Sequence, residues 1–239
     1  MPNLLDLALQ AHGGLDRWQQ LRTIDFRLAI QGALYAFKGF PEGLPSTAMH
    51  VEAHRPVATL MPYLTPDARG HFAADRVWIE GPGGQVLDQR ASPRASFAGH
   101  TLRTQWDQLQ RLYFTGYALW NCLAAPFLIA EGACDTHELA AHEENGDTWR
   151  RLQVTFPPGI PTHCPEQIFY FDDAGLLQRV DYAIDVAGVT VAHYCCDHSM
   201  VSGIVLATSH RVVRRANGGP QAARGAVLMQ LQLSNFFVS

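Results

Sequence analysis

Hydrophobic and polar positions alternate along most of this chain, a pattern typical of half-buried β-strands. In residues 24–30, the apolar side chains of Ile24, Phe26, Leu28 and Ile30 fall on one face of an extended segment. Comparable patterns predict strands at residues 33–39, 47–55, 75–81, 84–90, 149–156, 167–171, 176–186, 189–198, 203–213 and 227–238. The sequence therefore predicts a mainly β (α+β) protein, with about nine to eleven antiparallel strands in one sheet.

One long helix interrupts the strands, at residues 104–125. Its aromatic and leucine stripe recurs at steps of three and four residues: Trp106, Leu109, Tyr113, Tyr117 and Trp120. The pair Thr104 and Asp107 has the spacing of a capping box, and Pro126 follows the end of the helix. Such a stripe must be buried against the sheet. Core packing explains it, but Trp106, Tyr113, Tyr117 and Trp120 are also candidates for contact with a ligand.

The N-terminal segment predicts a short helix, with Asn3 as its cap and Gly13 at its end. It has neither the basic start nor the apolar run of a signal peptide, and five unpatterned cysteines fit a reducing compartment. We therefore expect a cytoplasmic protein with one domain, residues 1–239.

Composition argues against several kinds of partner. The net charge is −4 and basic residues cluster only at 211–215, which argues against a nucleic-acid partner. No apolar run reaches the length of a membrane span.

Three segments resemble the lipoprotein-carrier (LolA/LolB-like) fold superfamily: residues 11–32 (AHGGLDRWQQLRTIDFRLAIQG), 171–194 and 201–213. The resemblance implies a strongly curved, open antiparallel sheet, a half-barrel that wraps helices around an apolar cavity. It also implies a hydrophobic ligand. Because the chain shows no signal peptide or lipobox cysteine, we expect a cytoplasmic branch of this superfamily.

The stretch HYCCDH (residues 193–198) combines residue types that bind metals or catalyse reactions. A two-residue hairpin loop at Ala187–Gly188 would place Tyr182 directly opposite His193. Cys195 would then share the apolar core face with His193, and Cys196 would point the other way. Such divergent ligands do not converge on an ion, so we expect no metal here.

The opposite face of the same hairpin carries Arg179, Asp181 and Tyr194. Because this face is rich in charged and polar side chains, we expect it to meet solvent.

Two functions remain open. The first is binding of a hydrophobic or aromatic small molecule in the concave cavity, with Cys195 in its lining. The second is a cofactor-independent enzyme for proton transfer or hydrolysis, with His193 and Tyr182 as base and orienter, and His163 or His100 as acid. An isolated histidine among apolar walls would favour binding, whereas several titratable groups around one void would favour catalysis. We expect no cofactor.

Overall fold

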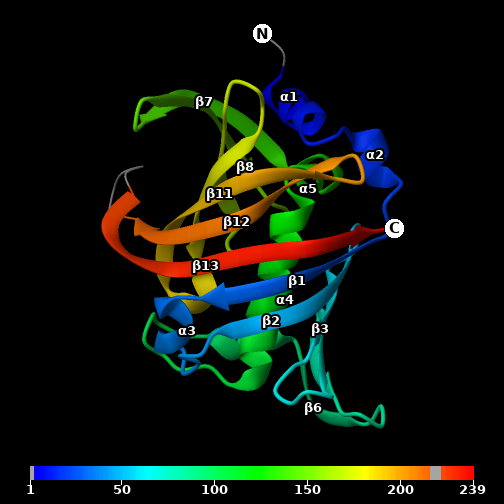
Figure 1. The fold of residues 1–239 in the computed structure, drawn as a ribbon. Helices are drawn as coiled ribbons and strands as arrows, with labels where there is room; N and C mark the ends of the chain where they lie inside the picture. Colours follow the sequence, from blue (N-terminus) through cyan, green and yellow to red (C-terminus); the bar gives the residue numbers. More distant parts are fainter. Residues whose placement is uncertain (1–2, 216–221) are drawn as a thin grey trace.

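The computed structural model describes residues 3–215 and 222–239 as a curved sheet with a long helix on its concave side (Figure 1). The helices are α1 (Leu4–Ala11), α2 (Leu15–Gln19), α3 (Ala33–Phe37), α4 (Gln108–Ala124) and α5 (Phe127–Glu131), with 3-10 turns η1 (Pro93–Phe97) and η2 (Asp185–Ala187). The first strands are β1 (Thr23–Gln31), β2 (Leu44–Glu52), β3 (Val57–Met61), β4 (Arg69–Ala73), β5 (Arg76–Glu80) and β6 (Val86–Ala91). The remaining strands are β7 (Asp135–Glu144), β8 (Asp147–Thr155), β9 (Glu166–Phe171), β10 (Leu177–Ile184), β11 (Val189–Val201), β12 (Ile204–Arg215) and β13 (Ala222–Val238).

The thirteen strands of the described residues form one sheet in the order β6-β5-β4-β3-β2-β1-β13-β12-β11-β10-β9-β8-β7. Each neighbouring pair is antiparallel. The first and last strands pair at the centre, so β6 and β7 lie at the two edges. The chain therefore has to cross from one edge to the other between β6 and β7, and α4 lies in this connection on the concave side.

Helix α4 is fixed at its start by a capping box. The side chain of Asp107 accepts a hydrogen bond from the amide of Gln110, and the Gln110 side chain accepts one from the amide of Asp107. The predicted pair Thr104 and Asp107 is thus wrong, because Asp107 is itself the N-cap and the helix begins at Gln108. Within the helix, a side chain at Gly116 would collide with the ring of Phe72, so glycine allows α4 to pack closely against β4.

The predicted fold class is confirmed, and the sheet has more strands than expected. The sequence patterns missed β3, β4 and β7; β3 and β4 are five residues long, and β7 is an edge strand with mostly exposed side chains. The predicted strand at 33–39 is wrong, because residues 33–37 form the short helix α3. The N-terminal helix is confirmed, with the Asn3 side chain accepting a hydrogen bond from the amide of Leu5.

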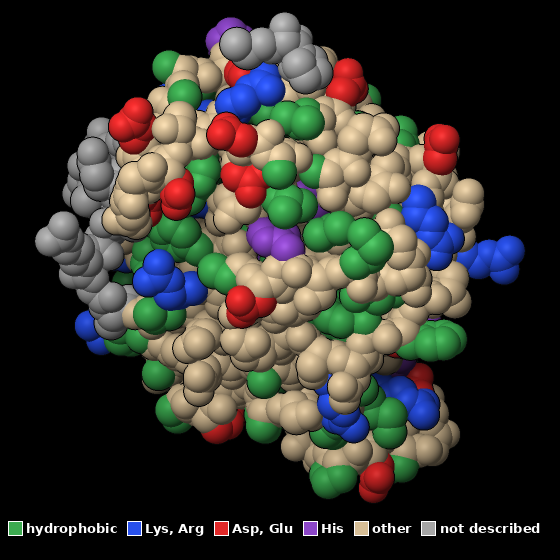
Figure 2. All heavy atoms as spheres, turned by 45° about the horizontal axis from the view of Figure 1, so that its top comes forward, with side chains coloured by type: hydrophobic (Ala, Val, Ile, Leu, Met, Phe, Trp, Pro, Cys, Tyr) green, Lys and Arg blue, Asp and Glu red, His purple; other side chains and the backbone are tan. Residues whose placement is uncertain are grey.

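None of the helices in the described residues is long and apolar enough to cross a membrane. On the face shown in Figure 2, acidic, basic and hydrophobic side chains are interspersed rather than gathered by type. That face therefore gives no sign of a large charged or apolar docking area.

Candidate functional site

The hairpin of β10 and β11 differs from its predicted register by two residues. Val180 is the direct partner of His193, and Tyr182 is opposite Val191, because η2 and Gly188 make a longer turn than the predicted loop. A two-residue shift leaves every side chain on the same face. Tyr182 and His193 therefore still share the core face, as diagonal neighbours.

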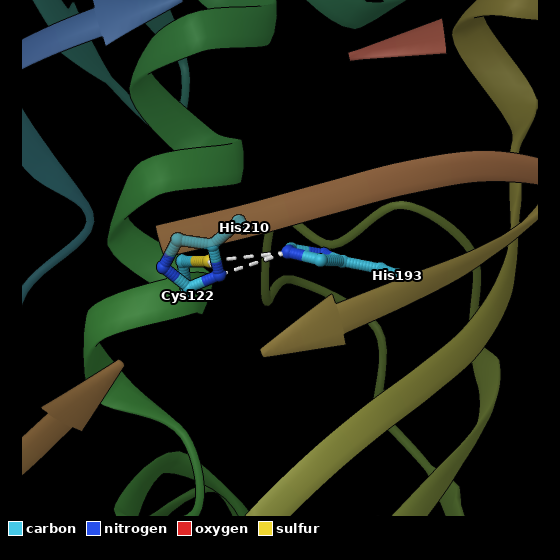
Figure 3. A group of neighbouring side chains, drawn as sticks. All are labelled: Cys122, His193 and His210. Carbon is cyan, nitrogen blue, oxygen red and sulfur yellow. Dashed lines mark hydrogen bonds between the residues drawn. The ribbon is translucent and has the colours of Figure 1, made fainter. Parts of the chain in front are cut away.

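These two residues begin a row of polar side chains buried beneath α4. The hydroxyl of Tyr182 lies 2.9 Å from Nδ1 of His193, and Nε2 of His193 lies 3.0 Å from Nδ1 of His210 on β12. Nε2 of His210 lies 3.0 Å from the carbonyl oxygen of Ala207. Figure 3 shows Cys122 of α4 beside the two histidines, with its Sγ 3.9 Å from His193 Nε2 and 3.7 Å from His210 Nδ1.

The end of this row determines the direction of each hydrogen bond. The carbonyl oxygen of Ala207 can only accept, so Nε2 of His210 carries the proton. Nδ1 of neutral His210 then accepts from Nε2 of His193, and Nδ1 of His193 accepts from the Tyr182 hydroxyl. In the neutral row each imidazole uses both nitrogens, and neither offers a lone pair to a substrate.

Burial keeps the row neutral. It lowers the pKa of His210 to about 4 and lowers the pKa of His193 well below its usual range, an effect strengthened by neighbouring His210 and His163. Burial also raises the pKa of the Cys122 thiol to about 12 and holds the pKa of Tyr182 well above its usual value.

His163 extends the row from the proline-rich loop between β8 and β9. Its ring stacks on Tyr182 with centroids 4.1 Å apart, and its Nδ1 lies 3.2 Å from the Tyr117 hydroxyl on α4. Burial and the positive charge of Arg94 lower the pKa of His163 to about 3. The Asn121 side chain donates to the carbonyl oxygen of Pro161 at 2.7 Å, which ties this loop to α4.

Two small cavities of about 40 and 20 Å³ border this row. Both are lined by Ala118, Cys122, His163, Tyr182 and His193. Most of the remaining lining is apolar, including Leu128, Phe169 and Val180 in the larger cavity and Ile30, Phe114 and Val212 in the smaller one.

A larger outer cleft of about 410 Å³ lies along the proline-rich loop. Arg94, Tyr113 and residues 156–162 contribute to its wall. Phe156 also lines the larger inner cavity, so the two spaces adjoin at this ring.

Of the predicted site residues, the structure brings His193, Tyr182 and His163 together, and Cys195 lines the larger inner cavity with them. His100 lies elsewhere, with its ring 5.5 Å from that of Phe97, and lines neither inner cavity.

The predicted aromatic stripe divides between two roles. Tyr113 lines the outer cleft, and Tyr117 hydrogen-bonds to His163. Trp106 and Trp120 are buried in the core and line none of these three spaces.

Sequence reasoning missed Cys122 and His210. His210 shares the period-two spacing of the buried residues Ile204, Leu206 and Val212 of β12. The alternation along this strand could therefore have predicted that His210 lies on the core face. Cys122 is four residues after Ala118 on α4, but no pattern links it to strands about 70 and 90 residues further along the chain.

The opposite face of the hairpin corrects another prediction. Arg179, Asp181 and Tyr194 were expected to meet solvent, yet their exposed fractions are 0%, 2% and 8%. Arg179 donates two hydrogen bonds to Asp181, at 2.6 and 2.9 Å, and one to Glu144 at 2.5 Å. Its guanidinium lies over the ring of Tyr170, 4.7 Å from the centroid, so aromatic rings on the convex face exclude water from these ions.

No protein-family model matches the sequence, and no curated protein matches it. Solved structures do match. A DUF1329-family protein from Desulfovibrio piger has a TM-score of 0.54 at 14% identity, over 98% of this chain and 90% of that chain. A domain named for outer-membrane lipoprotein sorting, from Vibrio parahaemolyticus, has a TM-score of 0.50 at 12% identity, over 98% of this chain and 91% of that chain. A LolA-superfamily protein from Nitrosomonas europaea has a TM-score of 0.49 at 12% identity, over 93% of this chain and 90% of that chain. At these identities the likeness of the first two structures concerns the fold alone.

Proposed function

We propose that the chain binds a hydrophobic or aromatic small molecule between α4 and the concave face of the sheet. The observation that carries this proposal is the pair of apolar-lined cavities that meet at the row of Tyr182 and His193. Ligand sites in proteins are typically apolar spaces with a few convergent polar groups.

The size of the spaces defines how a ligand would enter. A cavity of about 40 Å³ holds little more than a few water molecules, since one water needs roughly 10–15 Å³ on this measure. The outer cleft of about 410 Å³ has room for a larger molecule. The ligand would therefore occupy the cleft and extend an apolar part inward past Phe156.

Filling the inner cavities tests this proposal. Ala118 lines both of them, and replacing it with leucine adds three carbons to that wall. Ala118→Leu should weaken the saturable binding of an apolar fluorescent probe, 8-anilinonaphthalene-1-sulfonate, by at least about tenfold.

Ala130→Leu on α5 is the matched control, because Ala130 is partly buried but lines none of the three spaces, and it should bind the probe as the parent does. Equal affinity for the parent and Ala118→Leu, or no saturable binding by the parent, would contradict the proposal.

The second candidate is a cofactor-independent enzyme for proton transfer or hydrolysis on a hydrophobic metabolite. It is favoured by the convergence of His163, Tyr182 and His193 on one cavity. Binding leads because both nitrogens of His193 are already engaged in hydrogen bonds.

Replacing the central histidine separates the two candidates. In a catalytic site, His193→Asn should leave folding nearly intact and lower turnover by about 10²–10⁴-fold. In a binding site, it should lower the free energy of unfolding by about 1–3 kcal/mol. Ligand affinity should then fall only with the folded fraction.

We also propose that the protein works in the cytoplasm, as a cytoplasmic branch of proteins with this fold. All five cysteines are without a disulfide bond, which supports a reducing compartment. Alkylation of denatured protein taken directly from its host should modify five thiols per chain, and three or fewer would contradict this location.

A further inference from the structure

Cys122, His193 and His210 form a compact group of metal-ligand side chains from three separate elements. Their donor atoms all lie within 4.8 Å of one another. Figure 3 shows the three side chains pointing toward one another, from α4, β11 and β12. We propose that these residues bind one monovalent copper ion, Cu(I), a role that goes beyond the binding of a hydrophobic molecule.

The separations of the donor atoms fit one ion. They are 3.0 Å between the two histidine nitrogens, and 3.7 and 3.9 Å from the sulfur to each nitrogen. A circle through three such points has a radius of about 2.1 Å, close to the roughly 2.0–2.1 Å of metal–nitrogen and 2.3 Å of metal–sulfur bonds. An ion at the centre would lie near the plane of the three donors, which is a trigonal arrangement.

Neighbouring groups already orient both histidines. When His210 Nε2 donates to the carbonyl oxygen of Ala207, its Nδ1 lone pair points at the proposed ion. His193 has to change tautomer, so that Nδ1 donates to the Tyr182 oxygen and Nε2 presents its lone pair. Such hydrogen bonds from the distal nitrogen are the usual support of metal-bound histidine.

The charge of the site selects a monovalent ion. Binding replaces the thiol proton of Cys122, which leaves to solvent, with a sulfur–copper bond. One thiolate and two neutral imidazoles then give Cu(I) a complex with no net charge. Zn²⁺ would leave one positive charge buried, and no carboxylate is found among the described residues that line the two cavities. Thiolate is a soft ligand that favours Cu(I), and imidazole also binds copper.

Small spaces border two of the three side chains. Cys122 and His193 both line the two inner cavities, and Cys122 is partly exposed there. Two of the three side chains therefore border existing space, while His210 lines neither cavity.

Anaerobic titration with Cu(I) against a competing chelator tests the proposal. The parent chain should take up one ion, and X-ray absorption should give one sulfur and two nitrogen neighbours. Cys122→Ser and His210→Gln should each lower the affinity by at least about 100-fold, and Tyr182→Phe by about 10–100-fold.

Cys134→Ser is the control, because Cys134 lies outside the group, and it should bind as the parent does. Thermal unfolding of each variant establishes that it is folded. The X-ray absorption measurement uses the parent chain alone, so it tests the site even if a variant fails to fold. Absence of saturable Cu(I) uptake, undiminished uptake by Cys122→Ser, or tighter binding of Zn²⁺ than of Cu(I) would overturn the proposal.

Discussion

On the concave face of β10 and β11, Tyr182 and His193 are buried as neutral groups joined by a hydrogen bond of 2.9 Å, whereas on the convex face Arg179 and Asp181 are buried as ions. The same two strands thus bury polar groups in two different ways. Burial of a neutral group requires one partner for each hydrogen-bonding atom, while burial of an ion requires an opposite charge and several hydrogen bonds.

This difference bears on where a ligand can bind. In the convex cluster Arg179 is held by both Asp181 and Glu144 and is covered by the rings of Tyr170 and Tyr194. The concave row borders two cavities. We therefore expect a ligand bound on the concave side to leave the ionic cluster undisturbed.

The largest effect is expected from removing the central ion of the convex cluster. Arg179→Met leaves the buried Asp181 and the partly buried Glu144 with less compensation, and it should lower the free energy of unfolding by about 3–5 kcal/mol. Arg150→Met is the control, because the Arg150–Glu138 pair is more exposed and should contribute less than about 1 kcal/mol. Urea denaturation measures both, and equal losses would show that the convex cluster is not a buried ionic cluster in solution.

His12, at the end of α1, and the ionic cluster on the convex face should respond differently to acid. Burial lowers the pKa of His12 to about 4. The hydrogen bond from its Nδ1 to the carbonyl oxygen of Ala8 and the charge of Asp172 raise this pKa, while neighbouring His198 lowers it further. In the unfolded chain His12 therefore becomes protonated near pH 6.5, whereas in the folded chain it becomes protonated only near pH 4. The stability that His12 contributes is complete above pH 6.5 and falls by about 3 kcal/mol as the pH drops to 4.

Glu144 on the convex face should not contribute to this loss above pH 4.5. Burial alone would raise the pKa of Glu144, but the hydrogen bond from Tyr194 and the charge of Arg179 lower it below its usual 4.5. Denaturation of the parent and of His12→Asn between pH 7.5 and 4.5 separates these effects. The variant should show the shallower slope, and identical slopes would contradict a neutral buried His12.

Matched tyrosine substitutions compare the two faces directly. Tyr170 donates to the Asp181 carboxylate at 2.8 Å, and Tyr182 donates to the neutral His193 at 2.9 Å. Because hydrogen bonds to ions are stronger, Tyr170→Phe should cost about 1.5–3 kcal/mol of unfolding free energy and Tyr182→Phe about 1 kcal/mol. Chemical denaturation measures both losses, and a larger loss for Tyr182→Phe than for Tyr170→Phe would contradict the comparison.

The smallest effect is expected from filling the inner cavities. Ala118→Leu should raise the free energy of unfolding by up to about 1 kcal/mol, since it buries carbons in existing space. Ala130→Leu should change it by less than about 0.5 kcal/mol. Thermal unfolding measures both, and a clear loss for Ala118→Leu alone would indicate a tightly packed wall instead of a cavity.

Much of the fold could be predicted from the sequence, because period-two alternation determines which side chains share a face. Tyr182, His193 and Cys195 were placed on the core face correctly, although the hairpin register was off by two residues. The register depends on the conformation of the turn, and a 3-10 turn followed by Gly188 in the left-handed region, at a φ of 64°, has no unique sequence signature.

The candidate site was less predictable, because its parts come together only through tertiary structure. Cys122 and His210 reach His193 from α4 and β12, and this meeting depends on how α4 crosses the sheet. The convex face was misjudged for a related reason. Charged residues in a sequence usually indicate exposure to solvent. At Arg179 and Asp181, however, the rings of Trp149, Tyr170 and Tyr194 shield the convex face from water.

Native mass spectrometry of the chain purified from its own host tests the central claim, that the concave interior holds an apolar ligand, most directly. The parent chain should carry a non-covalent small molecule that dissociates on collisional activation, and Ala118→Leu prepared in the same way should lack it. A parent chain without any bound molecule, or the same molecule retained by both proteins, would contradict a ligand site at these cavities.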